Sequence, residues 1–460
     1  MSGTQRRPLP DHLWRPLTQH TLLQGQSRFC MVEAKGCYIT DENGKTYLDT
    51  MAGLWCVNVG YGRQELADAA HEQMSRLPYL APTMTAEPVS EFANKLKTLL
   101  GMDGHVYFST SGSEANEVAF KIVRQHHLQS GRGGERRFKI ISRYRAYHGN
   151  TMATMAATGQ AERKMGYEPG PPGFIHVMPP YPYRAHPKLS EEEHGEECAH
   201  LLEEAIIHEG AETVAAVLME PVISGGGVLI PPDNYLPRVR EICDRYGVLL
   251  IFDEVVSGLG RTGEMFAHHH WHTLPDLVTF AKGLASGYMP VAATFAREEI
   301  FESFLGEAGD LSHFRHINTF GGHPVAAAVA LRNIQIVEEE DLPGNAARVG
   351  DYLRTELAGA VGAHPNVGDI RGKGLLIGVE LVADRDSKVP LAQSDVTGII
   401  AHARENGVIL GCNANTIPGR CNVLLISPPL ILTREDAGRI VEVLAAALSD
   451  LSARGPAAVD

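Results

Sequence analysis

The stretch Leu250-Ile251-Phe252-Asp253-Glu254 has a counterpart further along the chain, Leu277-Val278-Thr279-Phe280-Ala281-Lys282-Gly283. Each is a short, largely apolar run that ends in one charged residue, Asp253 in the first and Lys282, 29 residues later, in the second. Apolar runs of this length, bounded by turn residues, are typical of strands buried on both faces of a parallel sheet. Because open α/β sheets bind ligands beyond the carboxyl ends of their strands, we expect Asp253 and Lys282 to lie at a ligand site.

Lys282 stands in an unusual context for a lysine. It is the only lysine between Lys188 and Lys373, although arginine is frequent there. Burial readily lowers the pKa of a lysine, so such a residue can act as a neutral amine, as a base or as a Schiff-base partner. The alternative is a strand-end lysine that extends its charge to solvent or pairs with a carboxylate. Taken alone, Lys282 is more typical of a strand-end lysine. The other motifs of the sequence favour the chemical role instead.

The composition is that of a folded protein of ordinary polarity. The chain has 460 residues, enough for about two or three domains, of which 44% are hydrophobic and 21% charged. Its net charge of −14 argues against nucleic-acid binding, which needs a basic surface. No stretch is apolar for long enough to span a bilayer, so we expect no membrane partner.

The cysteines and histidines show no metal-binding pattern. The seven cysteines are scattered and form no CxxC pair, which favours free thiols in a reducing cytoplasm. The consecutive residues His268-His269-His270 cannot share one face of a helix or strand, and we expect them in a solvated loop. The sequence therefore predicts a cytoplasmic protein without a metal site.

The order of the predicted elements indicates an α/β fold. Asn43-Gly44 lies between two alternating segments and predicts a hairpin over Gly36–Asp49. From Val106 to Ala296 strands alternate with helices, as in a mostly parallel, doubly wound sheet. Residues 165–195, rich in proline and charge, predict a long surface excursion. The expected division is an N-terminal arm and hairpin segment (1–70), a large domain (71–325) and a small α+β C-terminal domain (326–460).

The segment Ser111-Gly112-Ser113-Glu114-Ala115-Asn116 opens a predicted helix directly after a short strand. Hydroxyl side chains before an apolar helical run are typical N-cap residues, and Glu114 places a negative charge in the first turn. The free backbone N–H groups of such a helix start, together with the helix dipole, can also hold a phosphate. These residues alone leave both a phosphate site and a plain capped helix open.

The segment Gly258-Leu259-Gly260-Arg261-Thr262-Gly263 matches the GxGxxG pattern of dinucleotide-binding loops and follows a predicted strand. Its context differs from such a loop in two respects. Residues 253–257 separate the strand from the glycines, and residues 264–272 carry no apolar helical stripe. Both differences argue against a nicotinamide or flavin dehydrogenase.

Together, these features suit pyridoxal 5′-phosphate (PLP). A lysine forms a Schiff base with this cofactor, and a carboxylate beside the pyridine nitrogen keeps it protonated, so that the ring accepts electrons. An ionised Asp253 beside a pyridinium would be an opposite-charge pair. The helix start at Ser111–Asn116 can hold the phosphate, and Arg145–Gly149 places an aromatic residue, Tyr147, at the end of another predicted strand.

The sequence resembles the class III PLP-dependent aminotransferases, the ω-amino acid and amine transaminases. The resemblance covers nearly the whole chain, and its most specific piece is Leu250–Gly263 with Lys282 beyond it. The other matching motifs are Ser111–Asn116, Tyr147-His148-Gly149, Glu220-Pro221 and Thr319-Phe320-Gly321-Gly322-His323-Pro324. It implies the α/β architecture of fold type I of the PLP-dependent transferases, with a mostly parallel sheet in the large domain and a smaller α+β C-terminal domain.

The resemblance also implies roles for the matching residues. Lys282 would bind the cofactor and then move a proton between substrate and cofactor, while Asp253 would pair with the pyridine nitrogen. Glu220 would lie near the polar edge of the ring. Thr319 would reach the phosphate of a neighbouring subunit, in a homodimer or a dimer of dimers. The residues that would bind the cofactor are Ser111, Gly112, Ser113, Tyr147, His148, Asp253, Val255, Lys282 and Thr319.

Trp55, Tyr147 and Arg420 would line the substrate pocket. The segment Gly53–Arg63 resembles pyruvate-dependent members of the group, and the tail from Gly411 to Pro429 is more similar to taurine–pyruvate aminotransferases. Pyruvate-dependent amine transaminases place a mobile arginine in this tail to hold the carboxylate of the acceptor. Arg420 is the nearest arginine here, although its spacing to the following Ser-Pro-Pro departs from the family pattern.

The expected reaction has two steps. An amine donor such as taurine or β-alanine gives its amino group to the cofactor, and pyruvate then takes this group and leaves as alanine. One alternative is a class III enzyme that uses 2-oxoglutarate with 4-aminobutyrate, ornithine or diamine donors. Another is a racemase, mutase or decarboxylase of the same fold. A requirement for a keto-acid acceptor separates these last three from a transaminase.

Overall fold

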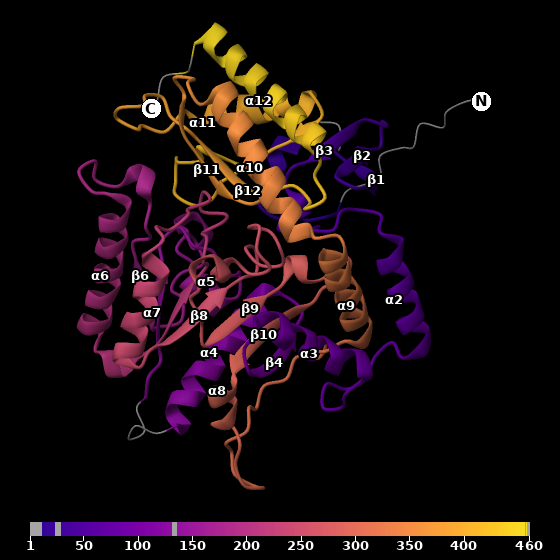
Figure 1. The fold of residues 1–460 in the computed structure, drawn as a ribbon, viewed down its shortest axis with the longest axis vertical. Helices are drawn as coiled ribbons and strands as arrows, with labels where there is room; N and C mark the ends of the chain where they lie inside the picture. Colours follow the sequence, from indigo (N-terminus) through magenta and orange to yellow (C-terminus); the bar gives the residue numbers. More distant parts are fainter. Residues whose placement is uncertain (1–11, 24–28, 131–135, 456, 458–460) are drawn as a thin grey trace.

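The computed structural model describes residues 12–23, 29–130, 136–455 and 457, and a seven-stranded sheet lies at its centre (Figure 1). The strand order is β4-β10-β9-β8-β7-β5-β6. Strands β5 to β9 run parallel, whereas β10 is antiparallel to both of its neighbours. The strands are β4 (Gly104–Ser109), β5 (Lys139–Arg143), β6 (Phe174–Val177), β7 (Val214–Met219), β8 (Leu249–Asp253), β9 (Leu277–Phe280) and β10 (Ala292–Arg297). The predicted mostly parallel sheet is confirmed.

Both faces of this sheet are covered by helices, which is why its central strands are apolar throughout. All six residues of β7 are buried. Its Val217 and Met219 pack with α6 (Glu191–Glu209) and α7 (Tyr235–Tyr246), whereas Ala216 and Leu218 pack with α4 (Gly112–Gln129). The alternation follows from the two-residue period of a strand. The short α5 (Met152–Ala157) and α8 (Glu298–Glu302) complete this part.

Three further helices lie beside the sheet and pack on one another, namely α2 (Gln64–Arg76), α3 (Glu87–Leu100) and α9 (Pro324–Glu339). The helical periodicity of the sequence predicts all three with these bounds. Gly101 ends α3 in the left-handed conformation, with a φ of 64° that glycine adopts without strain.

The C-terminal part contains an antiparallel sheet and three long helices. The sheet has the order β11-β12-β15-β14, and α10, α11 and α12 pack beside it at the top of Figure 1. The strands are β11 (Val367–Lys373), β12 (Leu376–Leu381), β14 (Gly411–Cys412) and β15 (Val423–Ile426). The helices are α10 (Leu342–Val361), α11 (Gln393–Glu405) and α12 (Arg434–Arg454).

The N-terminal strands join this C-terminal part. Strands β2 (Tyr38–Asp41) and β3 (Thr46–Asp49) form the predicted hairpin, with β1 (Met31–Lys35) beside β2. On its other edge β3 pairs in parallel with β13 (Val408–Ile409). The N-terminal hairpin therefore lies against the C-terminal part of the chain. The expected domain boundaries stay a prediction.

The prediction of a structureless excursion over residues 165–195 is wrong in part. Phe174–Val177 forms β6, the edge strand of the central sheet, and α6 already begins at Glu191. Ser190 caps α6, since its hydroxyl accepts a hydrogen bond from the Glu193 N–H while Glu193 bonds back to the Ser190 N–H. An edge strand of four residues with one buried side chain leaves almost no periodic pattern in the sequence.

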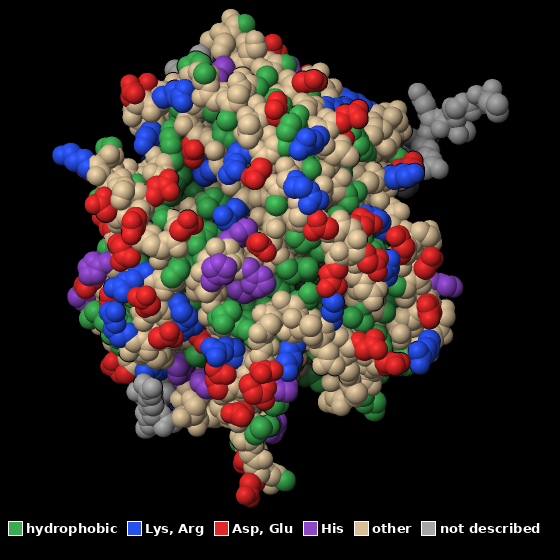
Figure 2. Space-filling model, viewed as in Figure 1, with side chains coloured by type: hydrophobic (Ala, Val, Ile, Leu, Met, Phe, Trp, Pro, Cys, Tyr) green, Lys and Arg blue, Asp and Glu red, His purple; other side chains and the backbone are tan. Residues whose placement is uncertain are grey.

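Figure 2 shows acidic and basic side chains interspersed over one face of the molecule, without a large area of one sign. Among the described residues, no helix is long and apolar enough to cross a membrane. No group of three or more His, Cys, Asp or Glu side chains in the described part of the chain is arranged to hold a metal ion.

Candidate active site

Four adjacent parallel strands deliver the predicted catalytic residues to one edge of the central sheet. Tyr147 and His148 follow β5, Glu220 follows β7, Asp253 ends β8 and Lys282 follows β9. These strands are hydrogen-bonded neighbours in the order β9-β8-β7-β5. Because they run in the same direction, their carboxyl ends meet at this edge, where α/β sheets bind ligands.

Asp253 is buried, and three donors hold its carboxylate. Oδ2 accepts hydrogen bonds from Asn116 Nδ2 and His148 Nδ1, each at 2.8 Å. Oδ1 accepts from the backbone N–H of Val255 at 3.1 Å. The side chain of Asp253 is only 3% exposed. The carboxylate therefore has one fixed orientation.

Asn116 is a site residue whose role the sequence motifs do not reveal. Its Nδ2 also donates to the carbonyl oxygen of His148 at 2.8 Å, and its Oδ1 accepts from Thr279 Oγ1 at 2.9 Å. Asn116 thus ties α4 to the ends of β5, β8 and β9. It lies four residues after Gly112, on the same face of the helix, and this spacing is the signal that could have identified it.

Glu220 is buried next to Asp253, and both of its carboxylate oxygens accept backbone hydrogen bonds. Oε1 accepts from the N–H of Tyr147 at 3.1 Å, and Oε2 accepts from that of Ser224 at 2.9 Å. Burial raises the pKa of Glu220 above its ordinary value; the nearby His148 opposes this rise, and Asp253 adds to it. Glu220 thereby fixes the segment that carries Tyr147.

Lys282 begins a tight turn directly after β9, with a backbone φ of 46°. The next residue is glycine because a Cβ there would lie 2.4 Å from Nδ2 of Asn58. Asn333 Nδ2 holds the turn by donating to the carbonyl oxygens of Gly283 and Leu284, at 2.9 and 3.1 Å. In the described part of the chain the Lys282 side chain has no hydrogen-bond or ion-pair partner, so its amine is available to a ligand.

The start of α4 offers free backbone N–H groups. Ser111 caps this helix, and its Oγ accepts from the Glu114 N–H at 3.2 Å. The N–H groups of Gly112 and Ser113 donate no hydrogen bond within the described part of the chain. A Cβ on Gly112 would lie 3.1 Å from both Cγ atoms of Val255, so these two predicted cofactor contacts are neighbours. The arrangement suits an anion at the positive end of the helix dipole.

Trp55 and Cys56 lie on a loop that Asp49, the last residue of β3, holds in place. Oδ2 of Asp49 accepts from the N–H of Gly53 at 2.6 Å and from the hydroxyl of Tyr61 at 2.7 Å. Burial raises the pKa of the Cys56 thiol, and the charge of Lys282 opposes this rise. A Cβ on Gly287 would lie 3.5 Å from Cβ of Cys56, and one on Gly283 would lie 2.4 Å from Nδ2 of Asn58, so this Trp55 loop lies beside the segment that begins at Lys282.

Two predicted residues lie apart from this cluster. Thr319 is exposed, and its carbonyl oxygen accepts a hydrogen bond from the hydroxyl of Tyr79 at 2.9 Å. Arg420 is also exposed, on the loop between β14 and β15. The structure leaves the roles of both as predictions.

The prediction that residues 268–270 form a solvated loop is wrong for His268. These residues belong to a short 3₁₀ turn, η5 (Ala267–Trp271), and His268 is fully buried against Glu254. Oε1 of Glu254 accepts from both Nδ1 and the backbone N–H of His268, each at 2.9 Å. Burial alone would raise the pKa of Glu254, but the hydrogen bonds and charge of His268 bring it below its ordinary value. The partner of His268 is the carboxylate of Glu254, 14 residues earlier in the chain, which the run of three histidines does not indicate.

The GxGxxG segment is a structural loop that packs on the C-terminal part. Arg261 is fully buried, and its guanidinium donates to the backbone oxygens of Leu375 and Pro428 and to Oδ1 of Asn58. A Cβ on Gly263 would lie 3.1 Å from the Cβ of Ala347 in α10. The glycines thus allow close packing, and Arg261 links this loop to the segment that holds Trp55.

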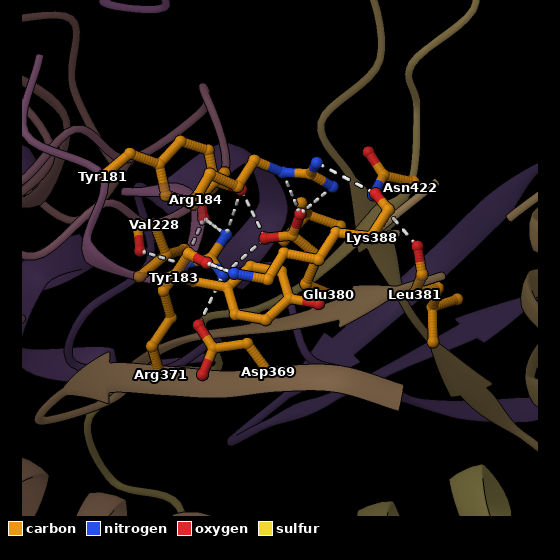
Figure 3. Close-up of polar contacts among 12 residues, drawn as sticks. Tyr181, Tyr183, Arg184, Val228, Asp369, Arg371, Glu380, Leu381, Lys388 and Asn422 are labelled. Atoms are coloured by element: carbon orange, nitrogen blue, oxygen red, sulfur yellow. Dashed lines mark hydrogen bonds and ion pairs between the residues drawn. The ribbon is translucent and has the colours of Figure 1, made fainter. Parts of the chain in front are cut away.

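A polar cluster centred on the buried Glu380 joins β11 and β12 to the segment that carries Tyr181 and Arg184 (Figure 3). Oε1 of Glu380 accepts from Nε of Arg184 at 2.7 Å, and Oε2 accepts from Nη1 of Arg371 at 2.7 Å and from the hydroxyl of Tyr181. Arg371 also donates to the carbonyl oxygens of Gly227 and Val228, at 2.6 and 2.8 Å. Gly227 and Val228 lie in one turn with Ser224, whose backbone N–H donates to Glu220. The cluster therefore connects β11 and β12 to the edge of the central sheet that carries Glu220.

Replacing Glu380 with glutamine is expected to destabilise the fold. The substitution removes the carboxylate partner of the partly buried Arg184 and leaves the buried Arg371 with Asp369 as its only carboxylate partner in the described chain. Breaking a buried ion pair typically costs about 3–5 kcal/mol in the free energy of unfolding. Burial raises the pKa of Glu380, but Arg371 and Arg184 outweigh burial and bring it below the ordinary value of 4.5. The stabilisation is therefore present above that pH and is lost as the pH falls further. Urea unfolding of both proteins at several pH values measures this difference.

Asp351→Asn is the matched control for that experiment, because its partner Arg354 is also arginine but the pair is largely exposed. The control should unfold like the wild type. Equal losses in the two variants, or a Glu380→Gln defect that persists at acidic pH, would contradict the role assigned to the cluster.

These residues fit PLP. Asp253 presents a fixed carboxylate to a protonated ring nitrogen, and Lys282 supplies a free amine. The N–H groups of Gly112 and Ser113, which have no partner in the described chain, suit a phosphate. A larger residue at Gly112 would fill the space between it and Val255. These groups therefore lie at one edge of the sheet, with Gly112 next to Val255, two residues after Asp253.

Comparisons with known proteins agree with this geometry. The family model "Aminotransferase class-III" matches residues 23–448. The chain is 50% identical over 412 residues to the uncharacterized aminotransferase YhxA of Bacillus subtilis, with 90% of both chains covered. It is 41% identical to the hypotaurine/taurine–pyruvate aminotransferase of Paracoccus denitrificans, with 96% of both covered. A solved aminotransferase structure from Bacillus anthracis is 45% identical, with a TM-score of 0.91 over 96% of each chain. The chain therefore belongs to the class III aminotransferases, which are PLP-dependent enzymes.

Proposed function

We propose that this aminotransferase moves an amino group from an ω-amino acid or a primary amine, such as taurine or β-alanine, to pyruvate. The observation that carries the reaction class is the free Lys282 amine on the strand next to the fixed Asp253 carboxylate. The choice of donor and acceptor is supported by the similarity, over almost the full length, to a hypotaurine/taurine–pyruvate aminotransferase. The products are an aldehyde or keto compound and alanine.

Bound PLP supplies an electron sink for the carbon that loses its proton. Asp253 holds a proton on the ring nitrogen, and Asn116 and His148 prevent its carboxylate from turning away. The N–H groups of Gly112 and Ser113 bind the phosphate at the start of α4. Tyr147, with its backbone fixed by Glu220, and Val255, next to Gly112, would hold the cofactor ring.

The amine of Lys282 moves the proton at the reacting carbon. A base is effective when it is held within hydrogen-bond reach of the proton that it takes. The turn after β9, fixed by hydrogen bonds from Asn333 and packed closely on Asn58, holds the backbone of this residue. Trp55 and Tyr147 shield the reaction from solvent, with Trp55 packing against a buried apolar cluster.

We further propose that the enzyme acts as a homodimer in the cytoplasm. Large apolar side chains are exposed near Thr319, the residue expected to reach a neighbouring subunit. They are Tyr79, Met84, Ile317 and Phe320. Exposed apolar groups of this kind mark protein interfaces. All seven cysteines are free thiols, which suits a reducing compartment.

A donor screen tests the proposed reaction. Taurine, hypotaurine, β-alanine, 4-aminobutyrate and putrescine are each offered with pyruvate and, separately, with 2-oxoglutarate. We expect alanine to form with pyruvate and at least one of the acid-bearing donors, and little turnover with 2-oxoglutarate. Glutamate as the main product would replace the pyruvate assignment, and turnover without any keto acid would contradict transamination.

A further inference from the structure

A guanidinium without a carboxylate partner lies beside Tyr147. Arg163 ends a short 3₁₀ turn, η2 (Ala161–Arg163), and its Cζ lies 5.5 Å from the centroid of the Tyr147 ring. Its Nε is buried and has no hydrogen-bond partner in the described part of the chain, where no carboxylate pairs with it either. Arginine stays charged inside proteins, and a buried charge without a partner is costly. The buried Nε therefore lacks an acceptor, and none of the residues that the structure describes supplies one.

Thr416 brings a second unsatisfied group to the same place. The residue is fully buried, and its Oγ1 has no hydrogen-bond partner among the described residues. Its carbonyl oxygen accepts from the N–H of Ala161 at 3.0 Å, which joins the loop between β14 and β15 to the turn that ends in Arg163. A buried hydroxyl without a partner is costly for the fold, so a ligand is expected to complete it.

Trp55 contributes a third such group. Its Nε1 is buried and unpartnered among the described residues. The Trp55 ring and Gln160, the residue before the η2 turn, both border Gly225, since a Cβ there would lie 3.8 Å from an atom of each side chain. Gln160 is itself fixed, since its Nε2 donates to the carbonyl oxygen of Arg145 at 3.0 Å.

The three atoms share one chemical property. Indole and guanidinium nitrogens only donate hydrogen bonds, and a hydroxyl can do so. Donors around a charged guanidinium suit a carboxylate or a sulfonate, which only accepts. Arg163 lies over the ring of Tyr147, the predicted wall of the substrate pocket, and Thr416 bonds to the turn that carries Arg163. Trp55 and Gln160, the residue before that turn, both border Gly225.

We propose that Arg163, with Thr416 Oγ1 and Trp55 Nε1, binds the acid group of the substrate. This inference rests on the proposed function, in which a taurine-type donor and pyruvate both carry such a group. Arg163 is then a specificity-determining residue, which separates acid-bearing substrates from neutral amines and aldehydes. Arg420, the arginine expected from the family pattern, is exposed, whereas Arg163 is half-buried over the ring of Tyr147.

Arg163→Gln tests this assignment in the PLP-loaded enzyme. The two half-reactions are followed separately by the change in cofactor absorbance. Donors are compared in pairs, β-alanine against propylamine and taurine against ethylamine, and pyruvate is compared with propanal as acceptor. We expect kcat/KM to fall about 10- to 100-fold with the acid-bearing partner, mainly through KM, and to change little with the neutral one.

Comparing the losses with the amine donors and with pyruvate shows which substrate's acid group Arg163 binds. A loss confined to the donors assigns the site to the ω-acid group, and a loss confined to pyruvate assigns it to the acceptor. Equal losses with acid-bearing and neutral substrates, or no loss with either, overturn the proposal. If the wild type uses another keto acid or donor, the proposed function fails, and the same comparison is then made with the acid that it does accept.

A binding measurement adds a readout that does not depend on turnover. Isethionate, which carries the sulfonate of taurine but a hydroxyl in place of the amine, should bind the Arg163→Gln holoenzyme more weakly by a similar factor in a calorimetric titration. Arg163→Lys keeps the charge and should recover part of the affinity. Arg404→Gln is the matched control, since Arg404 also lies 5.5 Å from a ring centroid, that of Phe29, and is remote from the site. Isethionate binding equal to that of the wild type overturns the proposal.

Discussion

Lys282→Ala is expected to lower transamination by about a thousandfold or more, because positioned acid–base groups alone contribute up to roughly 10⁴-fold and this lysine also anchors the cofactor. The amine has no partner in the described chain and lies beyond the strand next to Asp253. Single-turnover loss of the donor on PLP-loaded protein measures the effect. Borohydride should fix the cofactor covalently to the wild type and not to the variant.

Lys282→Arg tests whether a positive charge at this position is enough for activity. Arginine keeps the positive charge but cannot act as a neutral amine, so this variant should be as inactive as the alanine variant. Lys373→Ala, which changes the next lysine in the sequence, should leave the activity near that of the wild type. Near wild-type turnover by Lys282→Ala would remove the residue from its assigned role.

Asp253→Asn is expected to lower kcat by about 100- to 1,000-fold, since loss of one partner of a buried charge pair costs about 3–5 kcal/mol and each 1.4 kcal/mol is tenfold in rate. In either orientation the asparagine amide would also turn an N–H donor toward another donor, either toward the Asn116 and His148 side chains or toward the backbone N–H of Val255. The cofactor should dissociate more readily as well. Absorbance titration with PLP and steady-state kinetics at saturating cofactor measure the two effects.

Asp244→Asn provides the comparison for this variant, because it makes the same change on an exposed side chain of the preceding helix. Normal kinetics in Asp253→Asn would show that the carboxylate does not act on the ring nitrogen. A defect that disappears completely at saturating PLP would restrict Asp253 to cofactor binding.

The sequence predicts best the buried strands and helices, because their pattern of apolar residues lies within each element. The apolar runs before Asp253 and Lys282 are strands, and the helical periodicity of Gln64–Arg76 gives the observed bounds of α2. Such patterns survive because each residue must face either the core or solvent. The arrival of Glu220, Asp253 and Lys282 at one sheet edge follows from the parallel order of their strands.

The polar partners could not be predicted in the same way. Asn116 meets Asp253 across 137 residues, and Glu380 meets Arg184 across 196. These contacts depend on how helices and strands pack in three dimensions, and they leave no period in the sequence. The sequence does not indicate a role for Arg163 either, because this role is inferred from a buried Nε that has no hydrogen-bond partner among the described residues.

The pairing of β3 with β13 has a consequence for how this protein folds. Thr50, just after β3, donates to the carbonyl oxygen of Ile409, 359 residues further on. Closing so long a loop costs chain entropy, and during synthesis the contact must wait for the C-terminal strands. The sheet that carries Asp253 and Lys282 is complete in sequence long before then. We therefore expect the cofactor-binding edge to form early, and the Trp55 loop to gain its final position only after β13 has been synthesised.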